Sequence, residues 1–221
     1  DIQENRLTEL FKDALIAVES TSENNFSSYD LFVVFHAGIG QDFSLPFLDP
    51  TPEDIPSTFI DQSMIQEHLG ITSLFLNGTE ISRGILLPES QNHILFDISE
   101  SMFADASEPC EYQYGLTGTF ALMIGFSVGL PPMWNIDTGE SGIGIFGLMD
   151  QGSNNGRGII PSPPNAWTRI YSGWENPIMP DYNDKINLPA RSENNIVKVP
   201  INDSEYFLIE NRSNIVKNGM S

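Results

Sequence analysis

The feature that most constrains the fold is a run without a charged side chain at positions 112–136. Its middle part, FALMIGFSV, contains a single polar residue, Ser127. Gly129, Leu130 and two prolines follow. This pattern predicts a helix over residues 119–128, with Thr117 or Thr119 as N-cap and Gly129 as the stop. A helix that is apolar on all sides is typical of a fully buried element. The rest of the chain must therefore supply enough structure to cover it.

The same run has the length of a membrane span, and that alternative must be weighed. Several Gly and Thr residues and the Pro131-Pro132 pair interrupt it, and no Lys or Arg flanks either end. A spanning helix is usually oriented by such flanking charges. We therefore expect no membrane span.

Composition limits the class of protein and its partners. The chain has 221 residues, of which 40% are hydrophobic, enough for one sizeable core, so we expect a single domain over residues 1–221. The formal net charge of −20 disfavours binding to nucleic acid or to an anionic membrane surface.

Cys110 is the only cysteine, which excludes an intrachain disulfide. No signal peptide opens the sequence, and we expect a fragment of a longer secreted protein.

Helical and strand patterns mix along the chain without a βαβ repeat, which indicates the α+β class. An extended, proline-rich loop is expected over residues 42–57, and a hairpin is expected around Asn77-Gly78. The strand expected at 31–35 should end in a Gly-rich turn. The other expected elements are helices at 2–19, at 63–70 and within 161–174, and strands at 93–99, 195–201 and 205–211.

Two motifs suggest a cofactor or a metal, but their surroundings do not fit. GIGIFG at 142–147 matches the dinucleotide pattern G-x-G-x-x-G, yet no apolar strand precedes it and no helical pattern follows it. His36, His68 and His93 share no short ligand spacing, so we interpret them as ordinary structural residues. The sequence contains no intact catalytic motif of a known type, and we expect no bound cofactor.

Six segments taken together resemble the catalytic domain of the immune inhibitor A family of secreted zinc metallopeptidases. They occur in the family's order and span about residues 25 to 212. The segments are YDLFVVFHAGIGQD, LPES, GLP, GIGIFGLMDQGS, PSPPNAWTRIYSGW and EYFLIENR. The resemblance implies a zincin-like metallopeptidase domain, with a mixed sheet and a central buried helix that held the active site in its ancestors. It also implies a secreted or cell-surface protein, of bacterial origin.

The resemblance places the family's zinc motif on the charge-free helix. In the family this helix carries His-Glu-x-x-His-x-x-Gly-x-x-Asp, in which both histidines and the aspartate bind zinc and the glutamate is the general base. Counting from the retained Gly129, these four positions are occupied by Leu122, Met123, Phe126 and Pro132. The supporting residues Gly125, Gly129, Leu130, Pro131 and Met149 are retained, the last at the family's methionine turn beneath the metal.

Two functional hypotheses follow from this comparison. The first is a catalytically inactive metallopeptidase homologue that acts as an extracellular binding or structural module, with a protein or peptide as partner and no zinc. The alternative is an active secreted metal-dependent endopeptidase with non-standard ligands, for instance His36 or His93 with Asp137 and Asp150. A weaker hypothesis is a calcium site, because Asp137, Glu140 and Asp150 lie in Gly-rich loops and calcium prefers clustered oxygen ligands.

Overall fold

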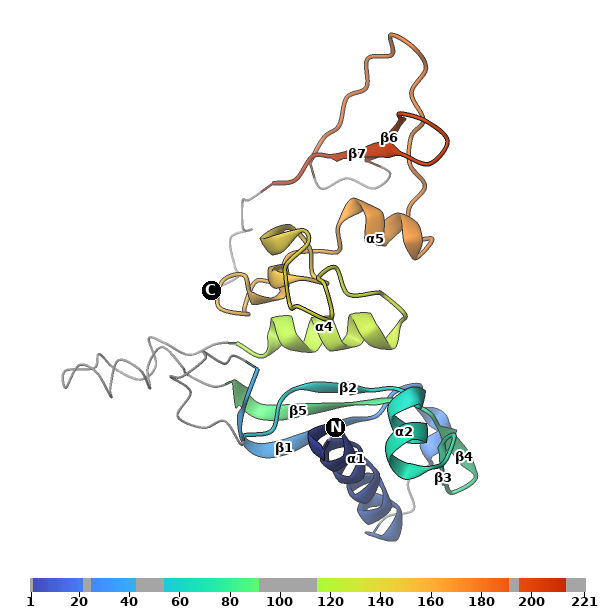
Figure 1. Ribbon diagram of the computed structural model, residues 1–221, viewed down its shortest axis with the longest axis vertical. Helices are drawn as coiled ribbons and strands as arrows, with labels where there is room; N and C mark the ends of the chain where they lie inside the picture. Colours follow the sequence, from blue (N-terminus) through green and yellow to red (C-terminus); the bar gives the residue numbers. More distant parts are fainter. Residues whose placement is uncertain (1, 22–24, 43–53, 92–114, 191–194, 214–221) are drawn as a thin grey trace, which may run out of the picture. The chain divides into compact units, whose positions relative to one another are not determined.

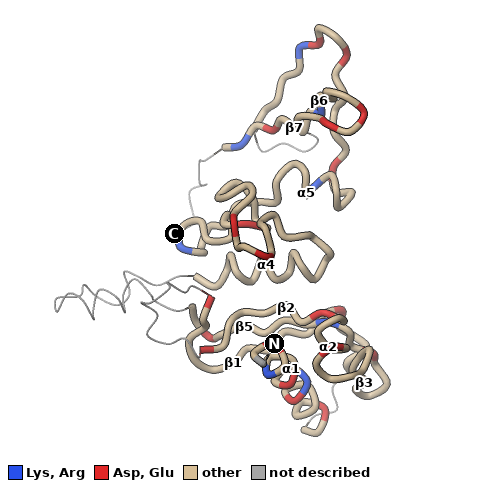
Figure 2. The backbone as a smooth tube through the Cα atoms, in the orientation of Figure 1, with Lys and Arg blue, Asp and Glu red and all other residues tan. Residues whose placement is uncertain are grey.

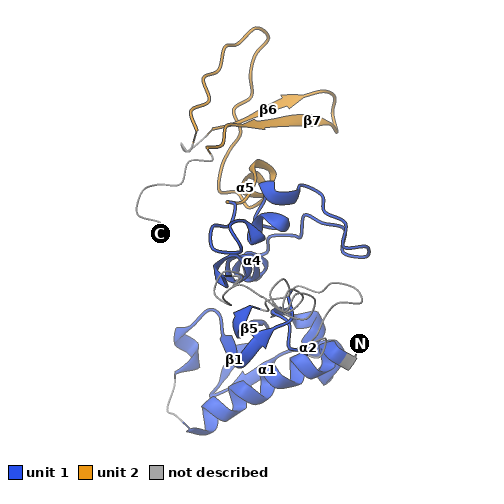
Figure 3. Cartoon of the chain, turned by 90° about the vertical axis from the view of Figure 1, so that its left-hand side faces the viewer, with its two compact units in different colours: residues 1–162 blue, residues 163–221 orange. Residues whose placement is uncertain are grey.

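The chain folds into helices and short sheets, which confirms the α+β class. The computed structural model describes residues 2–21, 25–42, 54–91, 115–190 and 195–213. The chain divides into two compact units, residues 1–162 and 163–221 (Figure 3). The expectation that both belong to one domain stays a prediction. Among the described helices, none has the length and apolarity needed to cross a membrane.

A three-stranded sheet forms the centre of unit 1, in the order β1-β5-β2. Strands β1 (Val33–Gly40) and β5 (Gly84–Gln91) are parallel, and β2 (Thr58–Ile60) is antiparallel to β5. The central strand contains Pro88, which has no N–H to donate. Because β2 pairs only with residues 84–86 of β5, the proline lies where the described sheet has a partner on one side only.

Helices α1 (Ile2–Thr21) and α4 (Thr117–Ser127) cover opposite faces of this sheet (Figure 1). Successive residues of a strand point to opposite faces, and the core follows that rule. Leu86 packs in a cluster with Leu7, Phe11 and Leu15 of α1. Ile85 and Leu87 instead pack in a cluster with α4. The charge-free helix therefore packs on one face of the sheet, and α1 packs on the other.

Local signals fix the smaller elements of unit 1 as expected. Helix α2 (Gln62–Leu69) begins after Asp61, whose side chain accepts from the N–H of Met64, and ends at Gly70 with φ of 69°. Strands β3 (Leu74–Leu76) and β4 (Thr79–Ile81) form the predicted hairpin. Asn77 and Gly78 have φ of 46° and 78°, as a type I′ turn requires. These predictions are confirmed.

Of the strand predictions, one needs correction and one lies outside the described residues, and two further strands were not predicted. The Gly-rich turn expected after position 35 is wrong, because β1 continues to Gly40 through a register shift between His36 and Ile39. Strands β2 and β5 were not expected: the first has three residues, and the second carries a proline and a continuous apolar run. The strand expected at 93–99 lies outside the described residues.

Unit 2 consists of the helix α5 (Ala166–Tyr171) and the antiparallel hairpin of β6 (Ile196–Pro200) and β7 (Tyr206–Glu210). Each lies within a segment where the sequence predicts it. Arg169 connects the parts, because its guanidinium donates to Glu175 at 2.9 Å and to Glu210 at 3.0 Å. Acidic residues are spread along the described parts of both units (Figure 2), and they form no acidic tail there.

Candidate functional site

Helix α4 carries the candidate site, and its end is built as the sequence predicts. Gly129 has φ of 85°, which favours glycine. Its N–H donates to the carbonyl of Phe126 at 2.9 Å, and the N–H of Leu130 donates to the carbonyl of Gly125 at 2.9 Å. These two bonds form a Schellman motif, which ends the helix at the expected place. Arg83 adds a third contact there, donating to the carbonyl of Ser127 at 2.7 Å.

The beginning of α4 differs from the expected N-cap. Leu116 occupies the cap position, and its side chain makes no capping bond. Thr119 lies inside the first turn, where its buried hydroxyl accepts from the Gln91 side chain at 3.1 Å. The N–H of Gly118 donates to the carbonyl of Gly158 at 2.7 Å instead. A loop distant in sequence thus replaces the cap that Thr117 or Thr119 was expected to provide.

The positions that correspond to the zinc motif lie in apolar surroundings. Met123 is buried against Ile85 and Leu87 of the central strand. Leu122 and Phe126 are half-buried and contact both this cluster and the loop cluster that contains Met149. The helix is therefore confirmed, and burial is complete for Met123 and partial for the other two. Pro132 is also half-buried, just beyond the end of the helix.

Aromatic rings surround Phe126. Its ring stacks with that of Phe59 of β2 at a centroid distance of 6.1 Å. On another side it meets the ring of Trp134 edge-on, at 5.9 Å. The sequence analysis did not predict this cluster, because Phe59 lies far from the helix in the sequence. No side chain of the three can act as a zinc ligand or as a general base.

Met149 lies directly against α4. Its side chain is 1% exposed, and its backbone carbonyl accepts from the N–H of Met133 at 2.8 Å. A Cβ added at Gly125 would overlap the sulfur of Met149 and would lie 3.5 Å from Leu130. Gly125 thus allows the close approach of the methionine to the helix. These are two of the positions that the family resemblance marks as retained scaffold.

Asp150, the next residue, anchors the Gly-rich loop. The side chain is 4% exposed. Its Oδ2 accepts from the hydroxyl of Ser141 at 2.9 Å and from the N–H groups of Gly142 at 3.0 Å, Ile143 at 2.8 Å and Gly144 at 2.9 Å. Its Oδ1 accepts from the N–H of Gln151 at 2.8 Å. The first two glycines of GIGIFG therefore direct their N–H groups at a carboxylate of their own chain, which leaves neither free for a phosphate.

This environment also controls ionisation. Burial by itself raises the pKa of Asp150, but the hydrogen bonds from backbone N–H groups and from the Ser141 hydroxyl outweigh it. The pKa of Asp150 consequently lies below its ordinary value of 3.8. The carboxylate is held in its charged form as a structural group.

The residues considered for a metal do not converge. Asp137 and Glu140 are exposed, whereas Asp150 is buried among N–H donors that would repel a cation. His36 lies in β1 with Nδ1 at 3.0 Å from the carbonyl of Ala37. His93 lies outside the described residues. In the described ranges, no three His, Cys, Asp or Glu side chains form a group that could hold a metal ion. The calcium site stays a prediction, with Asp150 its least suited ligand.

Sequence reasoning missed the anchoring role of Asp150. Its donors come from a stretch six to nine residues earlier, and only the folded loop brings them together. The available signal was the run of Gly and Ser ahead of an aspartate, which is typical of a turn held by a side chain.

Comparison of the chain with models of known families, with curated proteins and with solved structures finds no match.

Proposed function

We propose that the chain is a catalytically inactive homologue of the immune inhibitor A-like zinc metallopeptidases, with a zincin-like fold, and that it acts outside the cell as a binding or structural module. The observation that carries this proposal is the packing of Met149 against Gly125 of α4. On the same helix, Leu122, Met123 and Phe126 occupy positions that the resemblance assigns to the zinc motif. Gly125 and Met149 match the scaffold positions of the family, whereas the positions of its zinc motif are apolar. This combination supports descent from such an enzyme with loss of its catalytic activity.

The chemistry argues against hydrolysis at this helix. A zinc hydrolase needs ligands that hold the ion and a base that takes a proton from water. Leu122, Phe126 and Pro132 have neither kind of group. Met123 has only a weakly ligating thioether, and it is packed against the sheet. The helix therefore offers no position from which a water molecule could be activated.

Packing explains why such a set of substitutions is stable together. A histidine or glutamate left without its metal in this layer would cost about 1 to 3 kcal/mol for each unsatisfied polar group. Leu122 and Phe126 are four residues apart and share one face of the helix, so both fill the same layer. Apolar side chains there gain burial against the sheet and against Met149. Once catalysis is lost, packing alone favours these residues.

The proposed role as a module is based on the ordered structure around α4. The helix stop at Gly129, the close approach at Gly125 and the loop anchored by Asp150 are all formed, although the helix carries no catalytic groups. A fold kept in this way still offers surfaces to a protein or peptide partner. The secreted or cell-surface location belongs to the same proposal and rests on the family resemblance alone.

The test is a metal analysis of the purified chain combined with a peptidase assay. We expect well under one zinc per chain after dialysis against micromolar zinc. We also expect no chelator-sensitive cleavage of unfolded protein substrates, with an active zinc metallopeptidase assayed in parallel. About one zinc per chain together with cleavage that a chelator abolishes would overturn the proposal, and would favour the active enzyme with non-standard ligands.

A further inference from the structure

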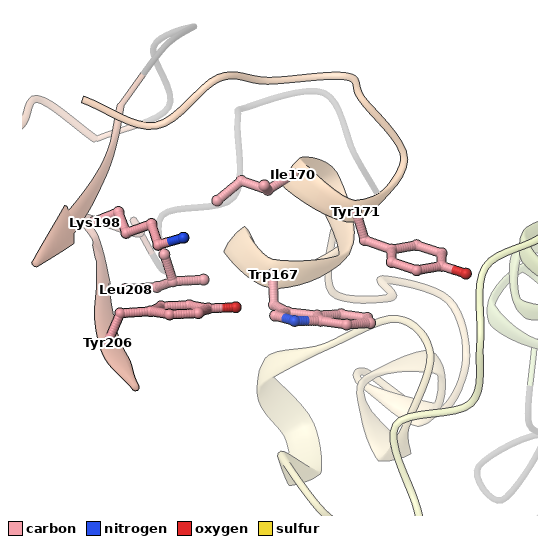
Figure 4. Close-up of a pocket in the computed structure, with 6 residues that line it drawn as sticks. All are labelled: Trp167, Ile170, Tyr171, Lys198, Tyr206 and Leu208. Atoms are coloured by element: carbon pink, nitrogen blue, oxygen red, sulfur yellow. The ribbon is translucent and has the colours of Figure 1, made fainter. Parts of the chain in front are cut away.

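Unit 2 contains a small trough between α5 and the β6–β7 hairpin, with a volume of about 200 Å³. One wall comes from the helix and the other from the hairpin (Figure 4). The residues that line the trough are Trp167, Ile170, Tyr171, Lys198, Tyr206 and Leu208. All but the lysine present rings or aliphatic groups. A space of this size and lining suits a single flat ring rather than an extended chain.

Each polar group that lines the trough can donate a hydrogen bond, and none of them is negatively charged. Lys198 Nζ lies 4.0 Å from the centroid of the Tyr206 ring, and it forms no ion pair with a carboxylate of the described residues. The Tyr206 hydroxyl extends from the hairpin toward Trp167 (Figure 4). Within the described part of the chain, neither this hydroxyl nor the indole N–H of Trp167 has a hydrogen-bond partner. No acidic side chain lines the trough.

Lys198 has no carboxylate partner among the described residues, although the chain has 30 acidic and 10 basic residues. The two described arginines of the same unit are paired: Arg169 contacts Glu175 and Glu210, and Arg212 also contacts Glu210. Among the described residues, the interaction recorded for the Lys198 ammonium is with the π face of Tyr206, which leaves its N–H groups able to donate. The lining of the trough therefore carries one positive charge and no negative charge, although the chain as a whole is acidic.

We propose that this trough binds small molecules that combine a flat apolar ring with a carboxylate. The ring is placed against Trp167 and Tyr206, because aromatic walls favour stacked or edge-on rings. The carboxylate pairs with Lys198 through a charge-assisted hydrogen bond. An uncharged ring would lack this charge-assisted hydrogen bond to Lys198. This site is independent of the proposed loss of zinc chemistry.

The test is an NMR titration of the full ¹⁵N-labelled chain with phenylacetate, followed at the indole N–H of Trp167. Trp134 and Trp174 are internal references, and phenylacetamide is the uncharged ligand of matched shape. We expect a Kd on the order of millimolar to ten millimolar for phenylacetate, as ligands of this size allow. Binding of phenylacetamide should be about tenfold weaker.

Variants separate the lysine from general charge effects. Lys198→Met should weaken phenylacetate about tenfold, whereas Lys198→Arg should retain binding. Lys185→Met, at an exposed lysine of the same unit, should leave the Kd unchanged. The proposal is overturned by the absence of a Trp167 shift, by equal affinity for the amide, or by equal losses from the Lys198→Met and Lys185→Met variants. Because Lys198→Arg keeps the charge, it remains informative even if Lys198→Met unfolds.

Discussion

Replacing Asp150 should loosen the Gly-rich loop next to α4, and the structure gives the size of the effect. The carboxylate accepts five hydrogen bonds, four of them on Oδ2. Hydrogen bonds to a charged group contribute about 1.5 to 3 kcal/mol each when measured singly, but bonds that share one acceptor do not add. Gly142 is exposed, so water replaces part of what its N–H loses. We therefore expect Asp150→Ala to lower the free energy of unfolding by about 3 kcal/mol.

The effect should depend on pH in a defined direction. The pKa of Asp150 is lower in the folded chain than its ordinary value of 3.8, so the unfolded chain binds the proton more readily. The stability from the ionised carboxylate is fully present above pH 3.8 and is lost as the pH falls through the lower, folded value. The difference between the parent and Asp150→Asn should thus be constant near pH 7 and should shrink below pH 3.8.

The assay is urea unfolding followed by circular dichroism, at pH 7 and at several acidic values. Asp137→Ala is the matched control, because this aspartate is exposed in the neighbouring loop, and we expect it to stay within about 0.5 kcal/mol of the parent. If Asp150→Ala were as mild as this control, the carboxylate would not anchor the loop. A difference that grows toward low pH would refute the assigned direction of the pKa shift.

Two further predictions concern the ends of α4. Gly118→Ala should destabilise the fold by about 1 to 3 kcal/mol in urea unfolding, because a Cβ would overlap the carbonyl oxygen of Ser153. An ordinary helical Gly→Ala change stabilises by about 0.5 to 1 kcal/mol, so a gain would contradict the contact. Arg83→Met should cost about 1 kcal/mol in thermal unfolding through loss of the bond to Ser127, whereas Arg6→Met, at an exposed arginine, should cost almost nothing. Equal effects would count against the role of Arg83.

Much of the fold could be predicted from local signals. Helix α2 has a side-chain cap at Asp61 and a left-handed glycine at Gly70, and α4 has the Schellman glycine Gly129, so their boundaries follow from a few residues each. The Asn77-Gly78 turn fixes its hairpin in the same way. Such signals act over one or two turns of chain, and they do not depend on the tertiary structure.

The missed features depend on contacts between distant segments. Strand β5 contains Pro88, and a proline usually argues against a central strand. It is tolerated here because β2 pairs only with residues 84–86 of β5 and so does not extend to Pro88. The cap of α4 comes from the carbonyl of Gly158, 40 residues after Gly118. At the candidate site, the helix stop at Gly129 could be predicted, whereas the stacking of Phe59 on Phe126 could not. Sequence patterns report periodicity and turns, but they do not report which loops meet.

The central claim is that α4 descends from a zinc-binding helix, and a repaired variant tests it most directly. The variant combines Leu122→His, Met123→Glu, Phe126→His and Pro132→Asp. Its control combines Leu122→Gln, Met123→Glu, Phe126→Gln and Pro132→Asn. These changes introduce polar side chains but not the two histidines and the aspartate that bind zinc in the family. Both should lose several kcal/mol of stability in chelator, because each change places a polar group in an apolar layer.

The decisive measurement is the Tm of the repaired variant, its control and the parent, each with zinc and with chelator. We expect zinc to raise the Tm of the repaired variant by several degrees and to leave the other two unchanged, since only that variant can hold the ion. The rescue should be incomplete, because the groups that orient metal ligands are expected to have changed as well. A Tm of the repaired variant that zinc does not raise would contradict the claim, because these four positions would then lack the geometry of a metal site.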